Sequence, residues 1–165
     1  MVIVLDNIRS AWNVGAIMRT CDAVGAKLIL LGYTPKPEGS TLKLIKKTAI
    51  GAEDTVEWES YDHYCQVFSK YSDKTHLAIE IADNCTSIFD YLHQISNTSD
   101  ALDISNIFLW FGNEIHGLEQ SLLEKTDRVL FLPMQGSKES LNVASCVCTC
   151  TYLFRYALFK GSINK

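Results

Sequence analysis

The side chains best suited to group-transfer chemistry gather in three polar, glycine-containing segments. These are residues 6–19, 111–118 and 132–143, and each begins at the end of a short apolar run that predicts a buried strand. Ligands of open α/β sheets bind beyond the carboxyl ends of the strands, so we expect the three segments to form one site. The candidate polar groups are Asn13, Arg19, Glu114, Ser140 and Asn142.

Each segment also has an interpretation that involves no chemistry. Asn13 can cap a helix, and Gly15 can let another group approach the first turn of that helix. Glu114 can stabilise a helix N-terminus, and Ser140 with Asn142 can open the last helix. Any one segment taken alone therefore leaves structure and function open.

Strand and helix patterns alternate along the chain, which predicts an α/β fold with a mostly parallel sheet and helices on both faces. The expected strands are 2–5, 27–31, 76–81, 107–111 and 128–132. The expected helices are 13–24, closed by Gly25, then 41–49, 61–71, 86–95, 118–125 and 140–159. A polar connector is expected at 97–103. Since the chain has 165 residues, we expect one domain over 1–160 and a short tail at 161–165.

Arg19 lies six residues after Asn13. That is nearly two helical turns, so we expect the two side chains to project on similar sides of their helix. An amide and a guanidinium on one side of a helix would both be available to a bound ligand.

Together the three segments resemble the motifs of the SpoU (TrmH) family of RNA ribose 2′-O-methyltransferases, in the SPOUT superfamily. Residues 13–19 resemble the first motif, Asn-x-Gly-Ala-x-x-Arg. Residues 111–118 look like the second, Phe-Gly-x-Glu-x-x-Gly-Leu. Residues 133–143 are similar to the third, Pro-Met-x-Gly-x-x-x-Ser-Leu-Asn-Val. The order and spacing agree, and the resemblance covers nearly the whole chain.

The resemblance implies a deep C-terminal trefoil knot, S-adenosylmethionine as the methyl donor, and a homodimer with its active site beside the subunit interface. The implied cofactor-binding residues are Gly112, Gly117, Leu132, Met134, Gly136 and Leu141. The implied catalytic residues are Asn13, Arg19, Glu114, Ser140 and Asn142. A guanidinium is effectively never deprotonated in proteins. We therefore expect Arg19 to orient a phosphate and stabilise a developing alkoxide.

RNA is the expected partner, with tRNA favoured over rRNA. The net charge of −4 argues against indiscriminate binding to nucleic acid, but Lys43, Lys46 and Lys47 fall on one predicted helix. They form either a contact to RNA phosphates or an ordinary solvated face. Trp12 either stacks on a base or is buried at the dimer interface. The alternative function is a knotted module that binds S-adenosylmethionine or RNA with little or no turnover and needs a partner protein.

Three of the six cysteines, Cys146, Cys148 and Cys150, are close enough in sequence to raise the question of a metal site. On a helix only Cys146 and Cys150 share a face, and no histidine nearby completes a tetrahedral set. We expect small-residue packing and no metal.

The chain is expected to lie in the cytoplasm. Its longest uncharged run, residues 140–154, is shorter than the ~20 apolar residues of a spanning helix. The first residues show no basic flank of a signal peptide. The cysteines are then expected to be free thiols.

Overall fold

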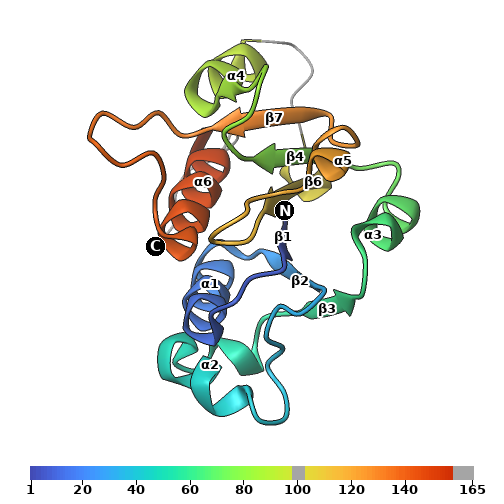
Figure 1. Ribbon diagram of the computed structural model, residues 1–165, viewed down its shortest axis with the longest axis vertical. Helices are drawn as coiled ribbons and strands as arrows, with labels where there is room; N and C mark the ends of the chain where they lie inside the picture. The colour runs from blue at the N-terminus through green and yellow to red at the C-terminus, as the bar shows by residue number, and fades with distance from the viewer. Residues whose placement is uncertain (98–102, 158–165) are drawn as a thin grey trace.

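The computed structural model describes residues 1–97 and 103–157. A seven-stranded sheet runs through the molecule in the order β3-β2-β1-β6-β4-β7-β5, and every neighbouring pair is parallel (Figure 1). The strands are β1 (Val2–Asp6), β2 (Lys27–Leu31), β3 (Trp58–Tyr61), β4 (Thr75–Ile79), β5 (Thr86–Ser87), β6 (Ile107–Phe111) and β7 (Arg128–Phe131). The predicted α/β class with a mostly parallel sheet is confirmed.

Helices cover both faces of the sheet. They are α1 (Ala11–Val24), α2 (Leu42–Ala49), α3 (Tyr64–Lys70), α4 (Ile88–Ser96), α5 (Gln120–Leu123) and α6 (Val143–Ala157), with 3-10 turns at Ala52–Asp54 and Ile104–Asn106. Buried side chains of α1, α2, α4 and α6 join one core cluster, and those of α3 and α5 join another. Figure 1 shows α1, α2 and α6 on one side of the strands and α3 with α5 on the other. No helix in the described residues is long and apolar enough to cross a bilayer.

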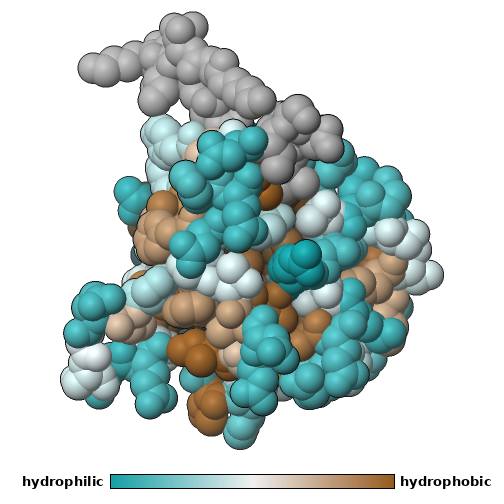
Figure 2. All heavy atoms as spheres, turned by 90° about the horizontal axis from the view of Figure 1, so that it is seen from above, coloured by the Kyte–Doolittle hydropathy of each residue, from teal (hydrophilic) through white to brown (hydrophobic). Residues whose placement is uncertain are grey.

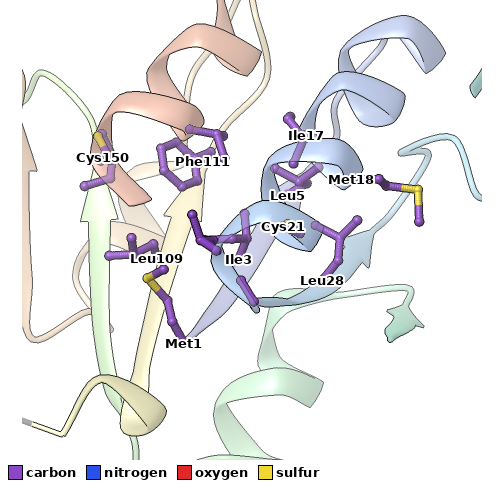
Figure 3. Packing of buried hydrophobic residues seen from close by; sticks show 14 of the residues in the cluster. Met1, Ile3, Leu5, Ile17, Met18, Cys21, Leu28, Leu109, Phe111 and Cys150 are labelled. Atoms are coloured by element: carbon purple, nitrogen blue, oxygen red, sulfur yellow. The ribbon is translucent and has the colours of Figure 1, made fainter. Parts of the chain in front are cut away.

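The larger core cluster lies between the sheet and the helices α1 and α6. Alternation along β1 sends Ile3 and Leu5 to this cluster and Val4 to the opposite one. Figure 3 shows the contributing side chains, among them Cys21 of α1 and Cys150 of α6. Each fully buried aliphatic side chain stabilises the fold by about 1.5–3 kcal/mol. The core therefore fixes both helices against the central strands.

The predicted helix 61–71 begins too early, because a strand precedes it. Residues 58–61 form the edge strand β3, and His63 caps the helix that follows by accepting from the Cys65 N–H. The two-residue strand β5 is also missing from the prediction. Both strands are short and lie at the two edges of the sheet, where one neighbour pairs with them and the hydrophobic pattern is weak.

The N-terminus of α1 differs from the prediction. Ser10, and not Asn13, is the N-cap, and its hydroxyl accepts from the Asn13 N–H at 3.3 Å. Gly25 ends the helix with a left-handed backbone, φ 64°, as predicted. The Asn13 side chain is thereby released from capping and faces the neighbouring segments.

The last helix begins at Val143, three residues later than predicted. The Asn142 carbonyl accepts the first helical hydrogen bond from Cys146, and its side chain accepts from the Ala144 N–H at 2.9 Å. Ser140 therefore lies in the loop before the helix. The predicted helix end at 159 and the tail at 161–165 lie outside the described residues, as does most of the 97–103 connector.

The sheet brings the three motif segments to one edge. Leu5 pairs with Phe111, and Ile79 pairs with both Phe111 and Leu130. The carboxyl ends of β1, β6, β4 and β7 are therefore neighbours. The loops that leave these four strands emerge side by side, as the sequence predicts for a single site.

Candidate active site

Glu114 lies at the centre of the polar network on this edge. One of its carboxylate oxygens, Oε2, accepts from the Arg9 N–H at 2.9 Å. The other, Oε1, accepts from the Ser10 N–H at 3.3 Å and from the Asn13 amide Nδ2 at 3.0 Å. The carboxylate thus ties the loop after β6 to the start of α1.

Asn13 continues the network into the third segment. Its Oδ1 accepts from Nδ2 of Asn142 at 3.2 Å. Since Asn142 Oδ1 is held by the first N–H groups of α6, the donor Nδ2 has a fixed direction. The order Glu114–Asn13–Asn142 joins one residue from each motif, and the structure brings these three predicted residues together.

The pKa of Glu114 is lowered from its ordinary value. Burial acts to raise it, but the N–H groups of Arg9 and Ser10 and the amide of Asn13 together outweigh burial. Hydrogen bonds donated to a carboxylate favour its charged form. Glu114 therefore remains an anionic anchor for the segment that begins α1.

Two glycines allow the loop after β6 to fold tightly. A side chain at Gly112 would overlap the backbone of Gly117 and Leu118. Gly117 has φ +66°, and a side chain there would overlap the carboxylate of Glu80. Asn113 fixes the turn to the loop after β1, because its amide donates to the Asn7 carbonyl at 2.8 Å. These glycines allow close approach of backbone within the loop and of the loop to Glu80.

An open pocket with a cavity volume of about 90 Å³ lies between the end of β4 and the loop before α6. Three of the predicted cofactor-binding residues, Leu132, Met134 and Leu141, line it. The predicted catalytic residue Ser140 lines it too. The other lining residues are Ile79, Glu80, Ile81, Phe131, Glu139 and Cys146. The other three predicted cofactor-binding residues, Gly112, Gly117 and Gly136, are not among the lining residues, and nothing lies within 4 Å of a side chain built on Gly136.

The sequence analysis does not identify Glu80, because it expects residues 76–81 to be strand throughout. The strand ends at Ile79, so Glu80 is the first residue of the loop. A charged residue at the end of an apolar run was the available signal.

Arg19 does not join the Glu114–Asn13–Asn142 network in the described residues. Six residues of α-helix rotate a side chain by about 600°, which leaves it roughly 120° away from Asn13. The expectation that the two project on similar sides is therefore wrong. Arg19 is exposed and lines a surface groove with Cys148 and Tyr152 of α6 and Lys47 of α2.

The three lysines of α2 are exposed, but two of them have partners. Lys46 pairs with Glu53 at 3.8 Å, and the Lys47 ammonium lies 5.9 Å from the ring centre of Trp12. Lys43 has no ion pair within the described part of the chain. Trp12 is 56% exposed, so its ring is accessible to a neighbouring molecule.

As predicted, Cys146 and Cys150 lie on one face of α6 and Cys148 lies on another. Cys146 and Cys150 share a hydrogen bond, which raises the pKa of Cys150 and lowers that of Cys146. Cys148 lies in the groove with Arg19. Within residues 1–97 and 103–157, no group of three or more His, Cys, Asp or Glu side chains could hold a metal ion.

The sequence matches the model of a known protein family over most of its length. The model of the SpoU rRNA Methylase family matches residues 1–152. The chain belongs to the SpoU rRNA Methylase family. The resemblance of the three motif segments to SpoU sequences is thereby confirmed.

Curated SpoU relatives are about a quarter identical to the chain. The 23S rRNA (guanosine-2′-O-)-methyltransferase RlmB of Bordetella pertussis is 25% identical over 154 residues, which are 92% of this chain and 58% of that protein. The tRNA (guanosine(18)-2′-O)-methyltransferase of Aquifex aeolicus is 26% identical over 144 residues, 87% of this chain and 63% of that protein. The chain therefore spans about three-fifths of the length of these relatives.

Solved SpoU structures share the fold. The SpoU methyltransferase AviRb from Streptomyces viridochromogenes, in complex with AdoMet, superposes with a TM-score of 0.79 at 22% identity, covering 98% of this chain and 59% of that one. The A. aeolicus TrmH/SpoU tRNA modifying enzyme gives a TM-score of 0.76 at 23% identity, covering 94% and 74%.

Proposed function

We propose that the protein transfers a methyl group from S-adenosylmethionine to a ribose 2′-hydroxyl of RNA, with tRNA favoured over rRNA. The observation that carries the proposal is the Glu114–Asn13–Asn142 network, which joins the three motifs. Leu141, next to Asn142 in the chain, lines the pocket. The named activities of the Bordetella and Aquifex relatives support the same reaction type.

The pocket fits the cofactor by its chemistry. Leu132, Met134 and Leu141 offer apolar surface to a flat adenine ring, and Glu80 and Glu139 offer acceptors to hydroxyl and ammonium groups. Gly112 and Gly117 would act on the pocket indirectly, through the tight turn that holds the Leu118 N–H against Glu80. When bound, S-adenosylmethionine supplies an electrophilic methyl group on a sulfonium.

The polar residues of the chain would align the ribose and exclude water. Asn13 and Asn142 hold each other, so their remaining hydrogen-bonding capacity has a fixed direction. Ser140, exposed in the pocket, would contact the ribose. Arg19 would orient an RNA phosphate and stabilise negative charge on the attacking oxygen. Lys43, Lys46 and Lys47 would add weaker phosphate contacts.

A homodimer belongs to this proposal. The groove that contains Arg19 is continuous through Tyr152 with a second apolar groove formed by Phe89, Leu92, Leu153 and Tyr156. Figure 2 shows one face of the molecule, where hydrophobic residues reach the surface between hydrophilic ones. Exposed apolar patches of this kind are typical of subunit interfaces. A partner subunit covering these grooves would place Arg19 at the interface.

The knot and the compartment are also part of the proposal. The superposition on AviRb supports a trefoil knot in the C-terminal part, because the fold is shared over most of the chain. All six cysteines are free, which suits the reducing cytoplasm.

The test is mass spectrometry of nucleosides in RNA from cells with and without the protein. We expect one 2′-O-methylated nucleoside to disappear from tRNA and to return when the purified protein and S-adenosylmethionine are added. The binding-module alternative predicts unchanged nucleosides together with measurable S-adenosylmethionine or RNA binding. That outcome would overturn the proposed enzyme activity.

A further inference from the structure

Glu80 is held in the pocket by backbone groups on both sides. Its Oε1 accepts from the Ile81 N–H at 3.0 Å, and its Oε2 accepts from the Leu118 N–H at 2.9 Å. A carboxylate offers about four lone-pair sites, so each oxygen keeps a site for a ligand. The charge is therefore fixed in position and still available inside the pocket.

The charge of the pocket has one sign. Glu80 and Glu139 are both carboxylates, and no Lys, Arg or His is among the described residues that line it. Most of the remaining lining is apolar, including Phe131, Leu132 and Leu141. Electrostatic attraction is stronger beside apolar walls than in bulk water. The pocket should therefore favour a ligand with net positive charge.

We propose that Glu80 makes the pocket discriminate between the cationic methyl donor and the neutral product. The inference rests on the proposed function, in which this pocket holds S-adenosylmethionine. At neutral pH the donor carries a sulfonium, an ammonium and a carboxylate, a net charge of +1. When the S–CH₃ bond breaks, its electron pair stays on sulfur, the methyl joins the ribose oxygen, and the hydroxyl proton leaves.

The product S-adenosylhomocysteine therefore has a neutral thioether and no net charge. Both ligands keep the ammonium group, but the part of the attraction to Glu80 that comes from the sulfonium acts on the donor alone. The consequence is relative relief from product inhibition. Glu139, which has no hydrogen bond within the described residues, adds to the same field from a less restrained position.

Glu80 also has a structural role that the experiment must separate. It supports the turn at Gly117 and Leu118, which belongs to the second motif. Loss of that support would weaken the binding of donor and product alike. The ratio of the two dissociation constants distinguishes charge recognition from loop support.

The experiment is calorimetric titration of the full chain with S-adenosylmethionine, S-adenosylhomocysteine and sinefungin, a cationic analogue that has no methyl to transfer. The variants are Glu80→Gln, which keeps the shape and removes the charge, and Glu139→Gln. The control is Glu38→Gln, an exposed carboxylate on the loop between β2 and α2 that does not line the pocket.

We expect Glu80→Gln to reduce the preference for the donor over the product by about three- to fivefold. The preference for sinefungin over the product should fall by a similar factor, because this preference also depends on the positive charge of the ligand. Glu139→Gln should give a smaller fall in the same direction, and it tests the inference if Glu80→Gln does not fold. Glu38→Gln should leave the ratio unchanged.

Two outcomes would overturn the inference, and they differ. Equal weakening of all three ligands by Glu80→Gln, with Glu139→Gln unchanged, would assign Glu80 to loop support alone. If the unmodified protein binds none of the three ligands, the proposed function itself fails, and this inference fails with it.

Discussion

The amide of Asn142 donates to the side-chain oxygen of Asn13 at 3.2 Å, across 129 residues of sequence. Both side chains are fixed at their other ends. Asn13 donates to Glu114, and Asn142 accepts from the first turn of α6. This one hydrogen bond links the start of the first helix to the start of the last, next to the pocket.

Replacing Asn142 should separate its two roles. Asn142→Ala loses the helix cap and the link to Asn13, and should lower the free energy of unfolding by about 1–2 kcal/mol. Asn142→Ser keeps a capping oxygen and loses only the link, so its cost should be smaller, about 0.5–1 kcal/mol. Urea denaturation measures both. Methyl transfer should fall strongly in both variants, and full activity in Asn142→Ser would refute the importance of the link.

Glu114 should make stability depend on acid pH. Its pKa is lower in the folded protein than its ordinary value of 4.5, so the unfolded chain binds more protons between the two values. The stabilisation is complete above pH 4.5 and is lost as pH falls through the folded pKa. The difference in unfolding free energy between wild type and Glu114→Gln should therefore shrink in that range.

The matched control for this pH dependence is Glu124→Gln, an exposed carboxylate outside the network that accepts from the side chain of Gln120. Its stability curve should run parallel to that of the wild type. If the difference in unfolding free energy between wild type and Glu114→Gln stays constant down to pH 3, the assignment of the hydrogen-bonded carboxylate as the anchor is contradicted.

Gly15 should be essential for packing of α1 against α2. A methyl group there would overlap the Thr48 hydroxyl and the Ile45 carbonyl. Gly15→Ala should therefore destabilise the protein by about 1–3 kcal/mol. Gly136→Ala is the control, because nothing lies within 4 Å of the added atom, and its melting temperature should match that of the wild type. Equal melting temperatures for both variants would show that steric overlap at Gly15 does not limit the packing of α1 against α2.

Lys47 should contribute to RNA affinity in a salt-dependent way. It stands over the Trp12 ring on the groove that contains Arg19. Lys47→Ala should weaken RNA binding and lower the slope of log affinity against log salt by about 1. Lys27→Ala, an exposed lysine paired with Glu57, is the control and should leave the slope unchanged. Identical slopes for both variants would show that α2 is only a solvated face.

Sequence reasoning predicted the central strands, and the sheet edge at which the motif segments meet, because the strand signals are strong. The runs at 27–31 and 107–111 are continuous and apolar, and the structure has β2 and β6 at the same bounds. The edge strands β3 and β5 gave no comparable signal, because a short edge strand pairs on one side only. The convergence of the three motifs followed from parallel strands whose carboxyl ends meet at one edge.

The finer geometry of the site could not be predicted in this way. Ser10 took the capping role expected of Asn13, since the helix begins two residues earlier. That shift released Asn13 to bind Glu114 and Asn142, a choice set by tertiary contacts. The direction of Arg19 follows from helical rotation, because a spacing of six residues places it roughly 120° away from Asn13. The motif pattern gives the spacing of the two residues and not the side of the helix on which each one lies.

Arg19 is the residue whose replacement most directly separates binding from chemistry. It is exposed and has no hydrogen bond or ion pair within the described residues, so Arg19→Ala should fold normally. It does not line the pocket, and S-adenosylmethionine affinity should stay within about twofold of wild type. Methyl transfer should fall by about 10²-fold or more, because charge on the attacking oxygen loses its donor.

The controls for Arg19 are Arg19→Lys and Arg128→Ala. Lysine keeps the charge without the planar fork of donors, so activity should recover only in part. Arg128 is exposed at the start of β7, outside both the pocket and the groove, and its loss should leave turnover unchanged. Equal methylation by wild type and Arg19→Ala would remove Arg19 from the reaction. The groove it lines would then serve subunit contact alone.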